Sequence, residues 1–188
     1  MSDDALHDRR HTHEDDYFRK RDRELVDKIR RAAAVKQAHA DIGAKTGLAD
    51  PAAQAELHAL GFTPDTVVLL PLVPVIETAW ADGGVSAAER ALIVELARSR
   101  GVTEGGAADR QLTHWLDRQP APAVFTGARR LIAALFEGGA PADLRAADLI
   151  KYCEDIAAAS GGVFGFAKVS ESERVTLERI AAAFKSRP

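Results

Sequence analysis

Apolar positions in this chain recur at the three- and four-residue spacing of amphipathic helices, in segments separated by glycine and proline. The spacing predicts helices over residues 63–80, 86–101, 107–117, 121–136, 141–159 and 170–184. Pro71 and Pro74 fall inside the first of these segments and predict a bend there. No segment shows a convincing strand alternation, so we expect an all-α fold.

The first 40 residues have a different pattern. Residues 14–40 are strong helix formers with opposite charges one turn apart, such as Glu24 and Lys28. The apolar stripe of this helix is thin and is interrupted by Asp22, so we expect a solvated helix that docks on the core or pairs weakly with a second copy. Glycine and proline then become frequent, which predicts a flexible tail and charged helix over residues 1–43 and a helical domain over residues 44–188.

The composition narrows the classes of function. The net charge of −3 comes from 25 basic and 28 acidic residues, so nothing favours a nucleic-acid partner. The longest apolar stretch, residues 67–76, is too short for a membrane span, which needs about 20 residues. The chain begins without a signal-peptide pattern and holds a single cysteine, Cys153, so we expect a cytoplasmic protein in which this thiol is buried.

One sequence unit occurs twice. The string Ala81-Asp82-Gly83-Gly84-Val85-Ser86-Ala87-Ala88-Glu89-Arg90 matches Ala159-Ser160-Gly161-Gly162 followed by Val169-Ser170-Glu171-Ser172-Glu173-Arg174. The insertion 163–168 separates the parts of the second copy, and we expect its two phenylalanines to pack on the core or to touch a partner. Each copy joins a glycine turn to a serine with glutamate three residues later, which is a capping box. The duplication predicts two pseudo-repeated helix-turn-helix halves.

The first copy, in its context Ala79-Trp80-Ala81-Asp82-Gly83-Gly84-Val85-Ser86-Ala87-Ala88-Glu89, resembles the ADG-x-V-S-x-x-E signature of the TerB-like family of tellurite-resistance proteins. The resemblance covers roughly residues 61–184. It implies an all-helical bundle, an association with stress defence, and acidic patches that bind metal ions. Ser160, the insertion and the charged first helix depart from the family pattern.

The acidic residues around the two turns are the candidate metal ligands. Carboxylates and backbone carbonyls are the ligands that calcium, magnesium and manganese prefer. If the two halves pack against each other, the acids of both turns converge. The candidate ligands are Glu77, Asp82, Glu89, Asp155 and Glu173, with Glu171 beside them.

The same acids have a simpler interpretation. Glu89 and Glu173 each suit the reciprocal bond of a capping box, and Asp82 suits a turn. The first turn also matches the residue pattern of the second half of a calcium-binding loop. Thr78 and Trp80 stand where that loop has its early oxygen ligands, so any affinity for calcium should be weak. An arginine is the alternative partner for a buried carboxylate.

Together with these features, the resemblance implies a non-enzymatic, stress-associated binding or adaptor protein with an acidic surface, a candidate divalent-cation site and a protein partner. No set of catalytic residues is apparent. Two alternatives remain open: a metal-dependent hydrolase that uses paired carboxylates, and a structural module that oligomerises through the helix at residues 14–40.

Overall fold

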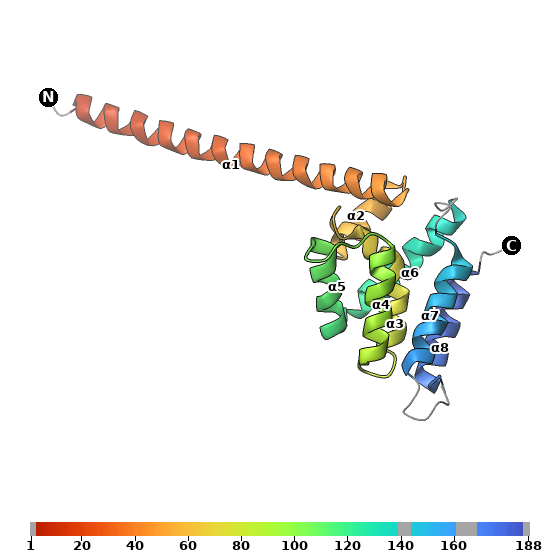
Figure 1. Cartoon of the computed structure of the whole chain (residues 1–188). Coiled ribbons are helices and arrows are strands. Elements are labelled where there is room, and N and C mark those ends of the chain that lie inside the picture. The colour runs from red at the N-terminus through yellow and green to blue at the C-terminus, as the bar shows by residue number, and fades with distance from the viewer. Residues whose placement is uncertain (1–2, 139–143, 161–168, 186–188) are drawn as a thin grey trace. The chain divides into compact units, whose positions relative to one another are not determined.

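The computed structural model describes the backbone of residues 3–138, 144–160 and 169–185, and within these ranges all regular structure is helical (Figure 1). The helices are α1 (Asp3–Thr46), α2 (Pro51–Ala59), the 3₁₀-helix η1 (Val67–Leu72), α3 (Val73–Ala79), α4 (Ala87–Ser99), α5 (Ala107–Asp117), α6 (Pro122–Glu137), α7 (Ala146–Ser160) and α8 (Glu171–Phe184). The predicted all-α fold is confirmed. No helix in the described ranges combines the length and apolar character that a membrane span requires.

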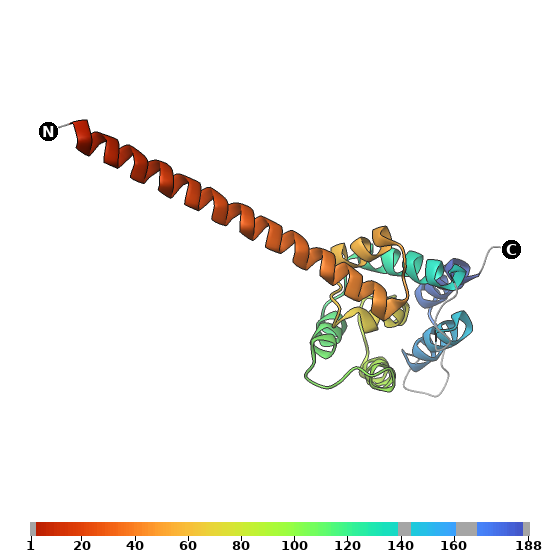
Figure 2. The ribbon, with the colours of Figure 1, turned by 90° about the horizontal axis from the view of Figure 1, so that it is seen from above.

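The chain divides into two compact units, residues 1–38 and 39–188. The first unit consists of most of α1, a single uninterrupted helix (Figure 2) that extends beyond the predicted residues 14–40 at both ends. α1 continues through Gly43, where the close packing leaves no room for a side chain. A Cβ there would lie 2.9 Å from the carbonyl oxygen of Leu48.

Helix α2 was not predicted from the sequence. It begins with Asp50, whose side chain accepts a hydrogen bond from the Ala52 N–H (3.0 Å), followed by Pro51 in the first turn. α2 packs against α6 (Figures 1 and 2). The approach is close, because a Cβ on Gly127 would lie 2.5 Å from Cδ1 of Leu60.

The segment predicted as one bent helix over residues 63–80 is a turn followed by two helical pieces. The Thr63 N–H donates to the Thr66 hydroxyl (2.8 Å), and the 3₁₀-helix η1 starts only at Val67. Pro71 lies inside η1, and α3 continues from Val73 with Pro74 in its first turn. Proline removes a backbone donor, which explains the change from 3₁₀ to α geometry here.

Helix α3 forms the centre of the second unit. All its residues, Val73–Ala79, are buried, and it contacts η1, α4, α6, α7 and α8. Figure 1 shows α3, α4, α7 and α8 side by side. Cys153 of α7 is fully buried in this core, as predicted, and the indole N–H of Trp80 donates to the Trp115 carbonyl (2.8 Å).

The remaining helices match their predicted ranges to within a few residues. The match is closest for α5, whose bounds Ala107–Asp117 are those predicted. α7 begins at Ala146, whereas residues 141–143 of its predicted start lie outside the described residues.

Candidate functional site at the two capping turns

The first turn joins α3 to α4 and carries a complete capping box. The Glu89 N–H donates to Ser86 Oγ (3.3 Å), while the Ser86 N–H donates to Glu89 Oε2 (2.7 Å). Gly83 has a φ of +86°, a left-handed conformation that a residue with a Cβ rarely adopts. Ser86 and Glu89 therefore begin α4 as the sequence predicts.

The second turn repeats this arrangement at the start of α8. The Glu173 N–H donates to Ser170 Oγ (3.1 Å), and the Ser170 N–H donates to Glu173 Oε2 (2.7 Å). The insertion 163–168 and the side chain of Ser160 lie outside the described residues. Both predicted capping boxes are thus present, with matching geometry.

A hydrogen bond joins the two turns. The hydroxyl of Ser170 donates to Asp82 Oδ1 at 2.7 Å, across 88 residues of sequence. The starts of α4 and α8 lie at the same end of the second unit in Figure 1. The same hydroxyl therefore accepts from the Glu173 backbone and donates to the acid of the other turn.

This contact brings together three carboxylates, Asp82, Glu89 and Glu173, which we call the acidic turn pair. Glu89 is 2% exposed and Glu173 is 1% exposed, whereas Asp82 is exposed. Burial raises the pKa of Glu89 above its ordinary value, the hydrogen bonds from Ser86 oppose this shift, and the charges of Glu173 and Asp82 add to it. The acidic turn pair therefore carries a net repulsion that a nearby positive charge would relieve.

The other two predicted ligands have cationic partners within the protein. Glu77 is largely buried and forms an ion pair with Arg129, and Arg179 Nη1 lies 3.7 Å from Glu77 Oε1. Asp155 is exposed and binds Lys151 one turn earlier on α7 (2.9 Å). Of the five candidate ligands, the contacts join Asp82, Glu89 and Glu173 and give Glu77 and Asp155 separate partners.

The described side chains form no cluster of three or more histidine, cysteine, aspartate or glutamate residues that could hold a metal ion. Each carboxylate of the two capping boxes already accepts a backbone hydrogen bond, and the exposed Asp82 carboxylate has lone pairs beyond the one that accepts from Ser170. The acidic turn pair is therefore suited to weak attraction of a cation or a cationic side chain. It is not arranged as a closed metal centre.

Two contacts at these sites were not predicted residue by residue. The sequence offers an arginine as the alternative partner of a buried acid without singling out Arg129, and it gives no partner for Ser170 beyond its own helix. Convergence of the two turns was the only available signal for the Ser170–Asp82 bond.

No protein-family model matches the chain, and neither the curated proteins nor the solved structures yield a match.

Proposed function

We propose that this chain is a non-enzymatic, stress-associated binding module of the TerB-like kind, which engages a protein partner through the acidic turn pair. A divalent cation is the candidate ligand that mediates this contact. The Ser170–Asp82 hydrogen bond is the observation that carries the proposal, because it joins two copies of one sequence unit and places their acids together.

The electrostatics of the acidic turn pair support the proposal. Glu89 is held in a buried position beside like charges, so its ionised form is disfavoured in the free protein. A cation at the exposed Asp82 would offset that repulsion and favour the ionised form. Oxygen-rich sites attract calcium, magnesium and manganese in preference to softer metals.

Thermal unfolding of the chelator-treated protein tests the proposal. A ligand present at about 100 times its dissociation constant adds roughly 2.7 kcal/mol to the free energy of unfolding. We expect millimolar calcium, magnesium or manganese to raise the melting temperature, and the double variant Asp82→Asn/Glu89→Gln to lose that rise. The control is Asp155→Asn, which removes one acidic charge outside the acidic turn pair.

An unchanged melting temperature with every cation would remove the ion from the proposal. A rise that survives in the double variant would place the ion elsewhere. Either result would leave Glu89 and Glu173 with their capping role and without a role in binding an ion.

A second candidate function is self-association through α1. The first unit exposes four large apolar side chains on α1, those of Leu25, Val26, Ile29 and Val35. Such a surface can be covered by another helix. In this proposal α1 of one copy pairs with α1 of another and buries part of this surface.

Removal of residues 1–38 tests self-association. We expect the full chain to show a concentration-dependent increase in mass by analytical ultracentrifugation, and the fragment 39–188 to sediment as a monomer. Replacement of Leu25 and Ile29 by Gln in the full chain should have the same effect as the truncation. A full chain that remains monomeric at all concentrations would contradict this candidate.

A further inference from the structure

The second unit contains a pocket away from the acidic turn pair, between η1, the end of α4 and α7. Its volume is about 740 Å³, within the range of roughly 300–1,000 Å³ that small-molecule sites occupy. Much of its wall is apolar and includes Val68, Leu70, Leu135 and Leu144. The basic residues on the wall are Arg100 and Lys45.

Arg100 is the unusual residue in this wall. Its guanidinium lies over the ring of Tyr152, with Cζ 5.5 Å from the ring centroid. Nε of Arg100 is buried and has no hydrogen-bond partner among the described residues. A buried donor without a partner is costly, and because Arg100 lines the pocket, a ligand bound there can supply an acceptor to its guanidinium.

The local backbone does not use the Arg100 side chain either. The carbonyls at the end of α4 accept backbone hydrogen bonds, among them Gly101 N–H to Arg98 (3.0 Å) and Val102 N–H to Ala97 (3.0 Å). Gly101 has a φ of +86°, as expected at the end of a helix closed in this way. The guanidinium of Arg100 is therefore not needed as a helix cap.

Lys45 is the second cation of the pocket, and it is already engaged. Its ammonium donates to the Pro64 carbonyl (2.6 Å) and lies 3.6 Å from Asp65. The charges of Lys45 and Asp65 offset each other, so Arg100 sets the positive charge of the pocket. This arrangement fits a ligand with one negative charge.

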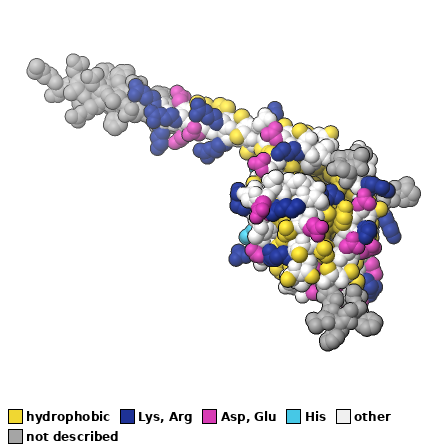
Figure 3. All heavy atoms as spheres, in the orientation of Figure 1, with side chains coloured by type: hydrophobic (Ala, Val, Ile, Leu, Met, Phe, Trp, Pro, Cys, Tyr) yellow, Lys and Arg dark blue, Asp and Glu magenta, His cyan; other side chains and the backbone are white. Residues whose placement is uncertain are grey.

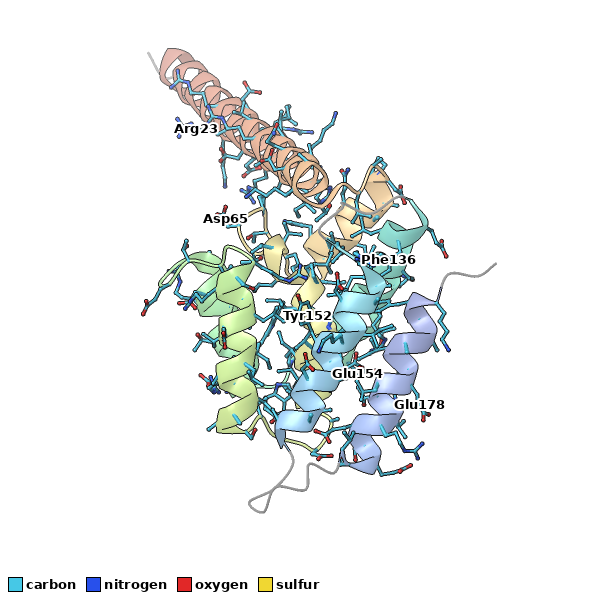
Figure 4. The ribbon with its side chains drawn as sticks, turned by 45° about the vertical axis from the view of Figure 1, so that its right-hand side comes forward. Arg23, Asp65, Phe136, Tyr152, Glu154 and Glu178 are labelled. Atoms are coloured by element: carbon cyan, nitrogen blue, oxygen red, sulfur yellow. The ribbon has the colours of Figure 1, made fainter. Side chains whose placement is uncertain are left out.

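A smaller groove of about 310 Å³ adjoins this pocket, since Ser99 and Tyr152 line both. Figure 4 shows Tyr152 between α4 and α7, and Figure 3 shows hydrophobic side chains on this face. The groove is lined by the apolar Leu92, Leu96 and Ile156 and by the acidic Glu95 and Asp155. An apolar chain fits along the groove, and the acids in its wall repel an anionic head, which favours placement of that head at Arg100.

From this arrangement we propose that the pocket binds a monocarboxylate with an unbranched apolar chain, its carboxylate on Arg100 and its chain along the α4–α7 groove. A planar guanidinium matches a carboxylate in a bidentate geometry, and its stacking on Tyr152 holds it in place. The pocket is independent of the acidic turn pair, so either proposal stands without the other.

Calorimetric titration of the full chain with decanoate, below its micelle concentration, tests this assignment. We expect decanoate to bind, decan-1-ol to bind at least tenfold more weakly because it lacks the charge, and acetate not to bind because it lacks the chain. Arg100→Met should weaken decanoate binding at least tenfold, and Arg100→Lys should weaken it less. Arg118→Met, a matched loss of an exposed arginine, should leave the affinity unchanged.

Amide NMR signals locate the ligand even if the Arg100→Met variant fails to fold. Decanoate should shift the signals of Ser99, Gly101 and Tyr152 in the unaltered protein. Decan-1-ol binding as tightly as decanoate, full affinity in Arg100→Met, or shifts confined to other helices would each overturn the proposal. Binding to anionic phosphatidylglycerol vesicles without binding to free decanoate would also overturn it, in favour of a membrane contact.

Discussion

Ser170 and Asp82 are joined by a 2.7 Å hydrogen bond that connects the start of α8 to the turn before α4. Ser170 is also the N-cap of α8, so its hydroxyl links the start of that helix to an acid that is distant in the sequence. The two capping turns therefore form one structural unit, and the properties of either turn should depend on the other.

A double-mutant cycle measures this coupling. Ser170→Ala should cost about 1 kcal/mol or more, because it removes the N-cap of α8 and the bond to Asp82. Asp82→Ala should destabilise the unaltered protein by about 1 kcal/mol more than it destabilises the Ser170→Ala variant. Chemical denaturation provides the four free energies of unfolding.

Ser86 offers a matched control for this cycle. It caps α4 as Ser170 caps α8, and the hydrogen bonds of this cap lie within its own turn. The cost of Asp82→Ala should therefore be the same in the unaltered protein and in the Ser86→Ala variant. Equal coupling in both cycles would contradict a specific Ser170–Asp82 interaction.

The raised pKa of Glu89 predicts a pH-dependent effect of Glu89→Gln. Between the ordinary carboxyl pKa and the higher folded-state pKa, the unfolded chain loses the proton while the folded protein keeps it, so Glu89 makes folding less favourable as pH rises. Glutamine preserves the capping bond and remains neutral. We expect the variant to gain stability relative to the unaltered protein as the pH rises from about 4 to about 7.

Denaturant titrations of both proteins at several pH values check this prediction. Glu171→Gln is the control, because its ion pair with Arg174 lowers the pKa of that exposed carboxyl and gives the opposite sign. A stability difference between Glu89→Gln and the unaltered protein that does not change with pH would count against repulsion at the acidic turn pair.

Removing one partner of the buried Glu77–Arg129 ion pair should destabilise the protein more than replacing both partners. Arg129→Met leaves the Glu77 carboxylate buried without its main partner, and such changes cost about 3 to 5 kcal/mol. We expect the lower end of that range, because Arg179 is also near Glu77. The double variant Glu77→Gln/Arg129→Met should recover most of the loss, as measured by denaturation.

Arg174 provides a comparison for this ion pair. It binds Glu171 and Glu178 on the exposed face of α8, where solvent screens the charges, so Arg174→Met should cost much less than Arg129→Met. Similar losses in the two single variants would show that burial does not set the contribution of the Glu77–Arg129 pair.

The thiol of Cys153 should be unreactive in the folded protein. Burial raises its pKa to about 12, so very little thiolate exists at neutral pH, and the side chain is inaccessible. A disulfide reagent such as DTNB should react only after denaturant unfolds the chain. Rapid reaction of the native protein would indicate that α7 opens from the core.

The starts of α4 and α8 were predictable from the sequence because they are encoded locally. Ser86 with Glu89 and Ser170 with Glu173 satisfy each other within three residues, so the start of α4 and of α8 needs no knowledge of the fold. α2 carries a comparable signal in Asp50 and Pro51, but the surrounding glycines favour a boundary between domains over a helix.

The partners of the acids were not predictable in the same way. Glu77 and Arg129 are separated by 52 residues, and their pairing depends on how α3 packs against α6. The repeat predicts convergence of the two turns only if the two halves pack against each other, and it gives Glu77 and Asp155 the same weight as Asp82. Asp155 instead binds Lys151 one helical turn away, a local alternative that the spacing also allowed.

The pKa of the Glu89 side chain, followed by ¹³C NMR with and without magnesium or calcium, tests the acidic turn pair most directly. We predict a pKa above the ordinary glutamate value in the ion-free protein, and a decrease when either cation is added or when Asp82 is replaced by Asn. A pKa at or below the ordinary value, unaffected by the cations and by Asp82→Asn, would contradict the role of the acidic turn pair as a binding site.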